Sequence, residues 1–198
     1  MEITMNGDYD IIEIEKDNIN LIKDLWEKNR IFHQNKTNNF SYQYSNLNFD
    51  ERMNNIFDSK DINHYKITGI ISQSNIIGYC LSIIQKNSGE LCTLFIDEKY
   101  RNNGLGHILI EKHLEWFKNN ECNSISVNVL IENKDTIKFY ESLGFKQNII
   151  NMKIPLKKIE VNGLSKSWMF EANLLARLPN FLETLSNLLI RISYDANS

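Results

Sequence analysis

The spacing of hydrophobic and polar positions predicts the first elements of the chain. The β-rich run YDIIEIE, residues 9–15, predicts a strand. Residues 18–33 carry apolar side chains at helical spacing, which predicts a helix capped by Asp17 or Asn18. The polar and aromatic residues 35–48 predict a loop, and residues 49–57 predict a short second helix.

The middle of the chain has the pattern of an antiparallel meander. Residues 64–97 contain three β-rich runs, separated by the turn-forming stretches QSN and KNSG. The last of these strands is expected over Glu90–Ile96. It leads into a glycine-containing segment and a helix from about Gly104 to Asn119.

The later elements alternate between strand and helix. Residues 124–130 predict a strand, and residues 145–156 predict a return to strand. Between them a helix is expected, with Asn133 as its N-cap and Gly144 just beyond its end. A strand–helix–strand unit within an otherwise antiparallel chain implies the fold class α/β (α+β), with a mixed, mostly antiparallel sheet flanked by helices.

The last forty residues have a different pattern, so we expect a main domain over residues 1–158 and an amphipathic helical extension over residues 159–198. Pro179 implies a kink or the start of a second helix. An exposed apolar stripe is a liability, which favours a homodimer through these helices over packing on the same chain or on a membrane surface. The stripe residues are Leu175, Leu178, Leu182, Leu185, Leu189 and Ile192.

Composition narrows the functional classes. The chain has 198 residues and a net charge of −3, which gives no support for a nucleic-acid partner. No run of about 20 apolar residues predicts a transmembrane segment, and the N-terminus lacks the pattern of a signal peptide. Three cysteines without a CxxC pair fit a reducing compartment, so we expect a cytoplasmic protein.

The segment DEKYRNNGLGHILI, residues 97–110, carries the main chemical signal. Gly104 and Gly106 precede a helix whose first N–H groups have no partner, which together favour a phosphate-binding site. A dinucleotide-binding loop is disfavoured because Leu109 occupies the position of its third glycine. A P-loop is disfavoured because its Gly-Lys-Ser/Thr element is absent.

Two motifs together resemble the GNAT family of acetyl-CoA-dependent N-acetyltransferases. The first is LFIDEKYRNNGLGHILI, with Arg101-Asn-Asn-Gly104-Leu-Gly106. The second is VNVLIENKDTIKFYESLGFK, which contains Asn133, Tyr140, Gly144 and Phe145. The resemblance covers about residues 9–158 and implies a GNAT-like sheet that splays between the strand ending at residue 96 and the strand over residues 124–130, with acetyl-CoA as co-substrate. No cluster of acidic residues or histidines suggests a metal site, so no metal is expected.

The resemblance also implies which residues hold acetyl-CoA. N–H groups at the helix start would bind the pyrophosphate, and the strand ending at residue 96 would pair with the pantetheine arm and polarise the thioester carbonyl. The implied residues are Leu94, Phe95, Ile96, Arg101, Asn102, Asn103, Gly104, Leu105, Gly106, His107 and Asn133.

The implied catalytic residues are Tyr140 as general acid and Glu90 as general base. The alternative explanation of Tyr140 is packing on its own helix, and that of Glu90 is a solvent-facing turn. Asn128 cannot act as a base and is expected to bind substrate.

The first two helices and their loop would grip the acceptor. His33 and Tyr42 are candidates there. The loop also offers Phe40, Tyr44 and Phe49. His107 and His113 are six residues apart, the wrong spacing for a shared metal, and both are expected to face solvent.

These observations predict an enzyme that moves acetyl from acetyl-CoA to a primary amine by direct attack. The acceptor would be a small polar amine or a peptide amine, and the net charge of −3 leans toward a cationic one. The alternative is an inactive acyl-CoA-binding sensor or interaction module.

Overall fold

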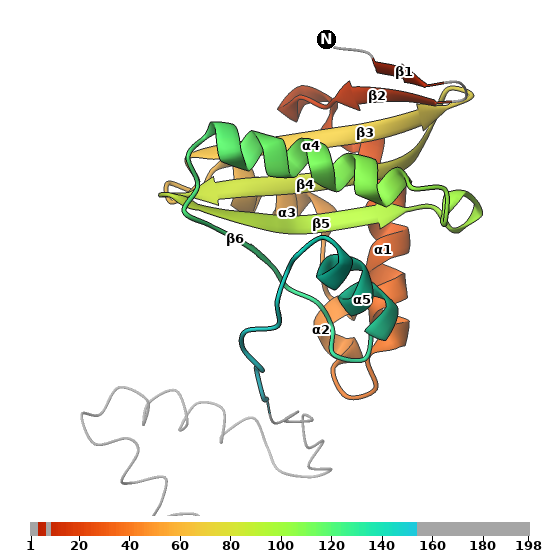
Figure 1. Ribbon diagram of the computed structural model, residues 1–198. Coiled ribbons are helices and arrows are strands. Elements are labelled where there is room, and N and C mark those ends of the chain that lie inside the picture. The colour runs from red at the N-terminus through yellow and green to blue at the C-terminus, as the bar shows by residue number, and fades with distance from the viewer. Residues whose placement is uncertain (1–3, 7–8, 154–198) are drawn as a thin grey trace, which may run out of the picture. The chain divides into compact units, whose positions relative to one another are not determined.

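A six-stranded mixed sheet forms the centre of the molecule (Figure 1). The computed structural model describes residues 4–6 and 9–153. The strands follow the order β1-β2-β3-β4-β5-β6; neighbours are antiparallel except β5 and β6, which are parallel. This confirms the predicted sheet. The strands are β1 Thr4–Asn6, β2 Tyr9–Glu13, β3 His64–Ser72, β4 Asn75–Gln85, β5 Ser88–Ile96 and β6 Ser124–Val127.

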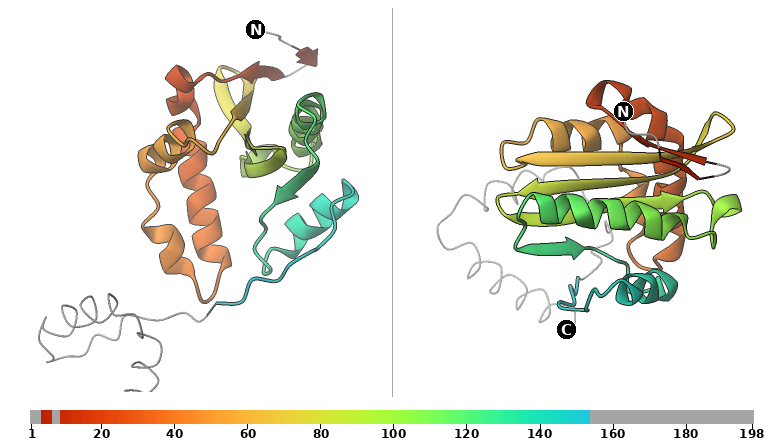
Figure 2. Two further views of the ribbon diagram at one scale, coloured as in Figure 1. Left: turned by 90° about the vertical axis from the view of Figure 1, so that its left-hand side faces the viewer. Right: turned by 45° about the horizontal axis from the view of Figure 1, so that its top comes forward.

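Helices cover both faces of this sheet (Figure 2). Side chains of α1 and α3 pack on one face around Trp26 and Phe49, whose rings are 5.5 Å apart. Side chains of α4 and α5 pack on the other face around Leu109 and Phe117. The helices are α1 Lys23–Lys36, α2 Ser41–Ser45, α3 Phe49–Phe57, α4 Leu105–Asn119 and α5 Lys134–Ser142, with 3-10 segments at Lys16–Ile22 and Glu98–Tyr100.

The prediction that Asp17 or Asn18 caps the first helix was wrong. The first helical region begins with a 3-10 segment at Lys16, preceded by Glu15, and no side chain caps it. A 3-10 helix repeats every three residues, so the apolar spacing shifts. Ile22 is fully buried, whereas Leu21 faces solvent.

The predicted loop 35–48 contains the short helix α2. A contact distant in sequence explains this difference, because Arg30 of α1 donates a hydrogen bond to the carbonyl of Tyr44 at 3.0 Å. The strand predicted over residues 145–156 is wrong in its described part. Residues 145–153 are irregular, and the side chains of Ile149, Ile150 and Met152 are exposed.

His113 corrects another expectation, because it lies in the core rather than in solvent. It shares the inward face of α4 with Leu109, Ile110 and Phe117. Its Nδ1 lies 2.6 Å from the hydroxyl of Ser82 on β4, and its Nε2 lies 3.1 Å from the hydroxyl of Thr68 on β3. Both ring nitrogens thus have partners, which permits the burial of a polar ring.

The predicted helical extension over residues 159–198, its leucine stripe and its homodimer lie outside the described residues, as does the proposed domain boundary after residue 158.

Candidate active site

A cleft of about 760 Å³ lies where β5, β6, α1, α5 and the start of α4 meet. It contains residues from both motifs of the sequence, which occupy residues 94–110 and 127–146. One wall is the end of β5, and the opposite wall is the segment from Val127 to Tyr140.

The cleft exists because β6 pairs with only the first part of β5. Their ladder runs from Ser88↔Ser124 to Leu91↔Val127 and then stops, although β5 continues to Ile96. The register between β4 and β5 shifts at the same place, where Leu81 is opposite Thr93 and Ser82 is opposite Leu91. Cys92 is thus the extra residue of a β-bulge, which bends a strand and ends regular pairing.

The open edge of β5 presents particular backbone groups. Asp97 donates its N–H to the carbonyl of Ile77 on β4 at 2.8 Å. Backbone groups alternate in direction along an antiparallel strand, so those of Phe95 also point toward β4. The groups of Leu94 and Ile96 point to the open side, where an extended ligand would pair.

The start of α4 faces the same cleft. Gly104 is its N-cap and has φ +77°, a left-handed conformation that favours glycine. A Cβ on Gly104 would meet no atom within 4 Å, and no side chain caps the helix. The first N–H groups of the helix, on Leu105 and Gly106, lack helical partners. His107 instead donates its N–H to the Gly104 carbonyl at 3.0 Å.

Arg101 links the segment before α4 to the end of β5 and to α1. Its Nε donates to the carbonyl of Ile96 at 3.0 Å. Its guanidinium lies over the rings of Phe32 and Phe95, each centroid 5.3 Å away. These contacts hold the loop after β5 against the helix that lines the other side of the cleft.

One face of α1 lines the cleft with residues at helical spacing, namely Asn29, Phe32, His33 and Lys36. The ring of His33 is stacked on that of Tyr44, with centroids 5.6 Å apart. Its Nδ1 is buried and has no hydrogen-bond partner among the described residues. Burial lowers the pKa of His33, so the imidazole is neutral at neutral pH.

Tyr140 reaches the cleft from the last turn of α5. Gly144, with φ +92°, ends this helix in a Schellman motif. The N–H of Phe145 donates to the carbonyl of Tyr140, and the N–H of Gly144 donates to that of Glu141, both at 3.1 Å. Burial raises the pKa of the Tyr140 phenol, with a smaller contribution from Cys80, so it stays protonated at neutral pH.

The cleft brings together most of the residues predicted to form the site. Glu90, Asn103 and Tyr42 do not line it. The predicted residues that line it are His33, Leu94, Phe95, Ile96, Arg101, Asn102, Gly104, Leu105, Gly106, His107, Asn128, Asn133 and Tyr140.

Three of the predicted positions need further description. Phe49, expected near the acceptor, is a core residue and is 2% exposed. Glu90 lies behind Asn128, which donates from Nδ2 to its Oε1 at 3.3 Å. Asn133 precedes α5 as expected, but its side chain makes no capping bond, so its amide is available to the cleft.

Sequence reasoning missed several lining residues. Asn29, Phe32 and Lys36 could have been found from His33, because they are spaced three or four positions apart on one helical face. Phe139 packs beneath Gly106, where a Cβ would lie 3.4 Å from its ring, and the sequence carries no signal for that contact.

Within residues 4–6 and 9–153, no group of three or more His, Cys, Asp or Glu side chains is arranged to hold a metal ion. No helix in that same part of the chain is long and apolar enough to cross a membrane.

The fold and the site share one arrangement: a mixed sheet opens between two parallel strands, and the glycine-capped start of a helix lies beside the opening. The chain belongs to the acetyltransferase (GNAT) family, whose model matches residues 24–145. This finding confirms the resemblance carried by the two motifs.

Individual proteins that are similar to this chain include N-acetyltransferases. Human N-alpha-acetyltransferase 30 is 37% identical over 57 residues, which cover 29% of this chain and 16% of the human protein. The chain therefore spans only about a sixth of that relative. The structure of the BH1408 protein of Bacillus halodurans has a TM-score of 0.58 at 18% identity, covering 74% of this chain and 99% of the other.

A further solved structure is the aminoglycoside N-acetyltransferase AAC(6')-Iy in complex with CoA. Its TM-score is 0.53 at 15% identity, and the match covers 73% of this chain and 98% of the other. At such identities, the two structural matches show a shared fold.

Proposed function

We propose that this protein is an N-acetyltransferase that moves an acetyl group from acetyl-CoA to a primary amine by direct attack. The observation that carries the proposal is the single cleft in which the open edge of β5, the glycine-capped start of α4 and Tyr140 meet. Membership of the GNAT family supports it.

The residues present fit acetyl-CoA. Open space above Gly104 and the unpartnered N–H groups of Leu105 and Gly106 suit a pyrophosphate. On the open edge, the N–H and carbonyl of Leu94 and the N–H of Ile96 suit the amides of an extended pantetheine arm, while the carbonyl of Ile96 accepts from Arg101. When bound, acetyl-CoA would supply the acetyl group as a thioester at the inner end of the cleft.

Tyr140 would donate the proton that the departing thiolate needs. Its raised pKa keeps the phenol protonated at neutral pH, as a general acid must be. Its position at the end of α5 is fixed by the Schellman motif and by the ring of Phe145, whose centroid is 5.5 Å away.

A base must remove a proton from the amine, because most amines arrive protonated. Glu90 lies outside the cleft behind Asn128, so it would act through water. His33 lies in the cleft and is neutral at neutral pH, which makes it a second candidate.

Direct attack is preferred over a covalent acyl-enzyme because the thiol in the cleft, that of Cys92, is protonated at neutral pH. Cys92 lines the cleft, but burial raises its pKa to about 12, with smaller effects from Glu90 and Arg52. A thiol in this state supplies almost no thiolate at neutral pH, and thiolate is the nucleophile that such a mechanism needs.

The acceptor would be a peptide amine or a small polar amine, bound against the face of α1. The similar proteins include an N-alpha-acetyltransferase, by its name an enzyme for a peptide amine, and an aminoglycoside N-acetyltransferase, by its name an enzyme for a small polar amine. We propose a cytoplasmic location, in line with the cysteine usage. A second subunit through residues 159–198 also stays a proposal.

A thermal melt with and without acetyl-CoA tests the proposal. At a hundredfold excess over Kd, a ligand that binds only the folded state adds about 2.7 kcal/mol of stability. We expect this gain in the wild type and its loss in Gly104→Glu, whose side chain fills the space above the helix start and repels phosphate. Gly104→Ala is the matched control, because it has the same strained φ without the bulk or charge and should retain most of the gain.

Release of free CoA thiol separates the enzyme from the inactive alternative. An enzyme releases thiol when an acceptor amine is added, whereas a sensor shows the thermal gain and no release. If acetyl-CoA does not stabilise a well-folded wild type against heat, the result contradicts both the enzyme and the acyl-CoA-binding sensor.

A further inference from the structure

Asn29 is a buried polar residue in the wall of the cleft. It belongs to α1 and lines the space, although the residue is only 8% exposed. A side-chain amide is rarely buried so deeply unless its hydrogen-bonding atoms have partners. Any hydrogen-bonding capacity of Asn29 that the protein itself leaves unused is therefore directed at a ligand in the cleft.

Tyr79 of β4 lies against Asn29. Its ring is fully buried, and its hydroxyl makes no hydrogen bond of regular geometry within residues 4–6 and 9–153. Burial raises the pKa of this phenol, and the side chain of Asn29 acts in the opposite direction. A neighbour that lowers the pKa of a phenol points a donor at its oxygen. The NH2 group of Asn29 therefore faces Tyr79, which leaves the carbonyl oxygen Oδ1 for the cleft.

The two residues lie next to the strand that would hold the thioester. Tyr79 is directly opposite Phe95 in the ladder between β4 and β5. Phe95 lies between Leu94 and Ile96, whose backbone groups face the open edge, and all three residues line the cleft together with Asn29. Oδ1 of Asn29 thus lies on the α1 side of the space in which the acetyl carbon would be held.

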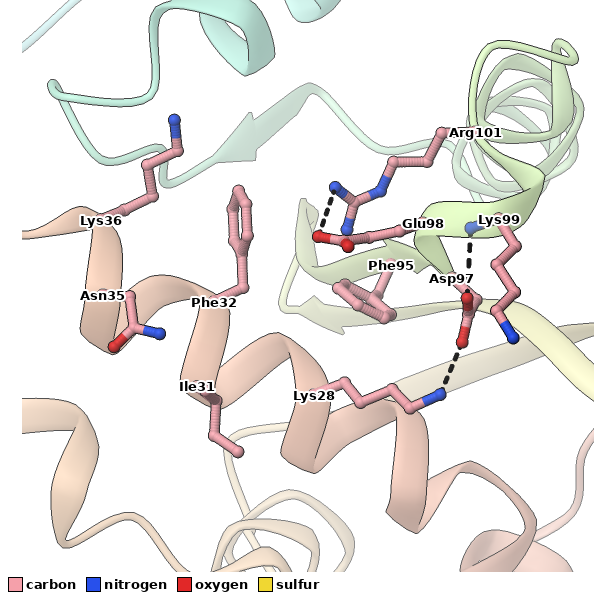
Figure 3. Close-up of a pocket in the computed structure, with 10 residues that line it drawn as sticks. All are labelled: Lys28, Ile31, Phe32, Asn35, Lys36, Phe95, Asp97, Glu98, Lys99 and Arg101. Carbon is pink, nitrogen blue, oxygen red and sulfur yellow. Dashed lines mark hydrogen bonds and ion pairs between the residues drawn. The ribbon is translucent and has the colours of Figure 1, made fainter.

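The surroundings of Asn29 favour a strong hydrogen bond. Phe32, three positions later on α1, lies beside Arg101 and Phe95 (Figure 3), and the guanidinium is 5.3 Å from the centroid of each ring. These three side chains line both the cleft and a neighbouring hollow of about 550 Å³. A hydrogen bond made beside such packed rings is stronger than one in open water.

We propose that Asn29 binds the attacking amine of the acceptor, with Oδ1 accepting one of its N–H groups, and that Tyr79 is a positioning residue that holds the amide in this orientation. The inference rests on the proposed function and deepens it, because it names the group that receives the amine in the same cleft. A side-chain amide does not remove a proton, so the base is a separate residue.

The reaction balances with this assignment. The lone pair of the neutral amine forms the C–N bond while the C–S bond breaks, and the leaving thiolate takes the proton of Tyr140. One amine proton passes to the base, which returns it to Tyr140 through solvent, and the other stays in the product amide. Oδ1 of Asn29 holds this retained N–H, which orients the lone pair toward the acetyl carbon.

Two analogues of the joined substrates test the assignment: the methylamide and the methyl ester of carboxymethyl-CoA. The methylamide has an N–H near the place of the attacking nitrogen, and the ester has an oxygen there. We expect the wild type to bind the methylamide about tenfold more tightly in isothermal titration calorimetry, because the ester leaves the buried Oδ1 without a donor.

Substitutions locate the preference. In Asn29→Leu it should fall to about twofold or less, whereas Asn29→Asp, whose carboxyl group still accepts, should keep it. Tyr79→Phe should reduce it in part, because the amide loses the neighbour that orients it. The matched control is Asn35→Leu, the same change on the same helix at a residue that lines the hollow (Figure 3), and it should keep the full preference.

Equal binding of the two analogues by the wild type, or a preference kept in Asn29→Leu, would overturn the inference. Tighter binding of the ester would overturn it too, because the NH2 group would then face the cleft. If neither analogue binds a well-folded wild type, the proposed function fails and the inference with it, since both analogues contain CoA. Binding needs no turnover, so the result is separate from the thiol assay.

Discussion

Tyr140 is held by aromatic neighbours on both sides. The rings of Phe139 and Phe145 lie 5.2 and 5.5 Å from its ring, both in edge contact. The side chain is 6% exposed, so little freedom remains for the phenol. A group this well fixed needs no reorganisation before it donates a proton.

Replacing Tyr140 with Phe removes only the hydroxyl. We expect kcat to fall by about a hundredfold, the usual contribution of a general acid, while KM for acetyl-CoA changes little. Steady-state kinetics of thiol release would measure this.

Tyr65→Phe is the control, because that ring packs against Phe57 on the other face of the sheet. A Tyr140→Phe enzyme with undiminished kcat would leave the tyrosine with a packing role alone.

The position of the candidate base, Glu90, was not predicted correctly, because Glu90 does not line the cleft. Glu90 is two positions before the bulged Cys92, and a bulge changes the direction in which nearby side chains point. The sequence gives no sign of a bulge. The helix-borne residues Asn133 and Tyr140 are positioned by a regular period, and the structure places both in the cleft as expected.

The C-terminal end of α5 fixes the position of Tyr140. Gly144 adopts φ +92°, and the two hydrogen bonds of the Schellman motif depend on that conformation. One of them uses the carbonyl of Tyr140 itself. The helix end therefore fixes both the termination of α5 and the position of the proposed acid.

Gly144→Ala should lower the free energy of unfolding by about 1 kcal/mol, because an L-residue is strained at this φ. A Cβ would meet no atom within 4 Å, so the loss comes from the backbone alone. Gly144→Asn should cost less, since Asn tolerates the left-handed region. Urea unfolding measures both, and equal losses would argue against a backbone origin.

Elements with a regular hydrophobic period were predicted well, namely α3, α4, α5 and the three-stranded meander. Helix α2 and the 3-10 segment before α1 were not predicted. Helix α2 depends on Arg30, fourteen residues before the carbonyl that it binds, and the 3-10 segment before α1 follows no α-helical period. Such elements are set by tertiary contacts, which local patterns do not contain.

At the scale of the whole molecule, His113 joins three elements. It links α4 to β3 and β4 through two hydroxyl groups, deep beneath the sheet face. Burial lowers its pKa to about 3, and the positive charge of Lys66 adds to this. The folded protein therefore keeps the ring neutral, whereas the unfolded chain binds a proton near pH 6.5.

The stabilising effect of a neutral His113 is complete above pH 6.5 and is lost as the pH falls from 6.5 toward 3. Within this window the free energy of unfolding should drop by about 1.4 kcal/mol for each pH unit through this residue. Urea unfolding at a series of pH values measures the slope.

His113→Gln should flatten that slope, whatever its effect at neutral pH. His64→Gln, at an exposed position on β3, should retain it. An unchanged slope in His113→Gln would assign the acid sensitivity to other groups.

The opening between β5 and β6 also has a consequence for association. From Cys92 to Ile96, β5 is in effect an edge strand placed inside a sheet, with main-chain groups that could pair with any extended chain. Two features restrict that pairing: the bulge at Cys92 and the side chain of Arg101, which occupies the carbonyl of Ile96. A narrow, partly blocked edge resists a strand from a neighbouring molecule, so the features that shape the cleft also protect the protein against aggregation.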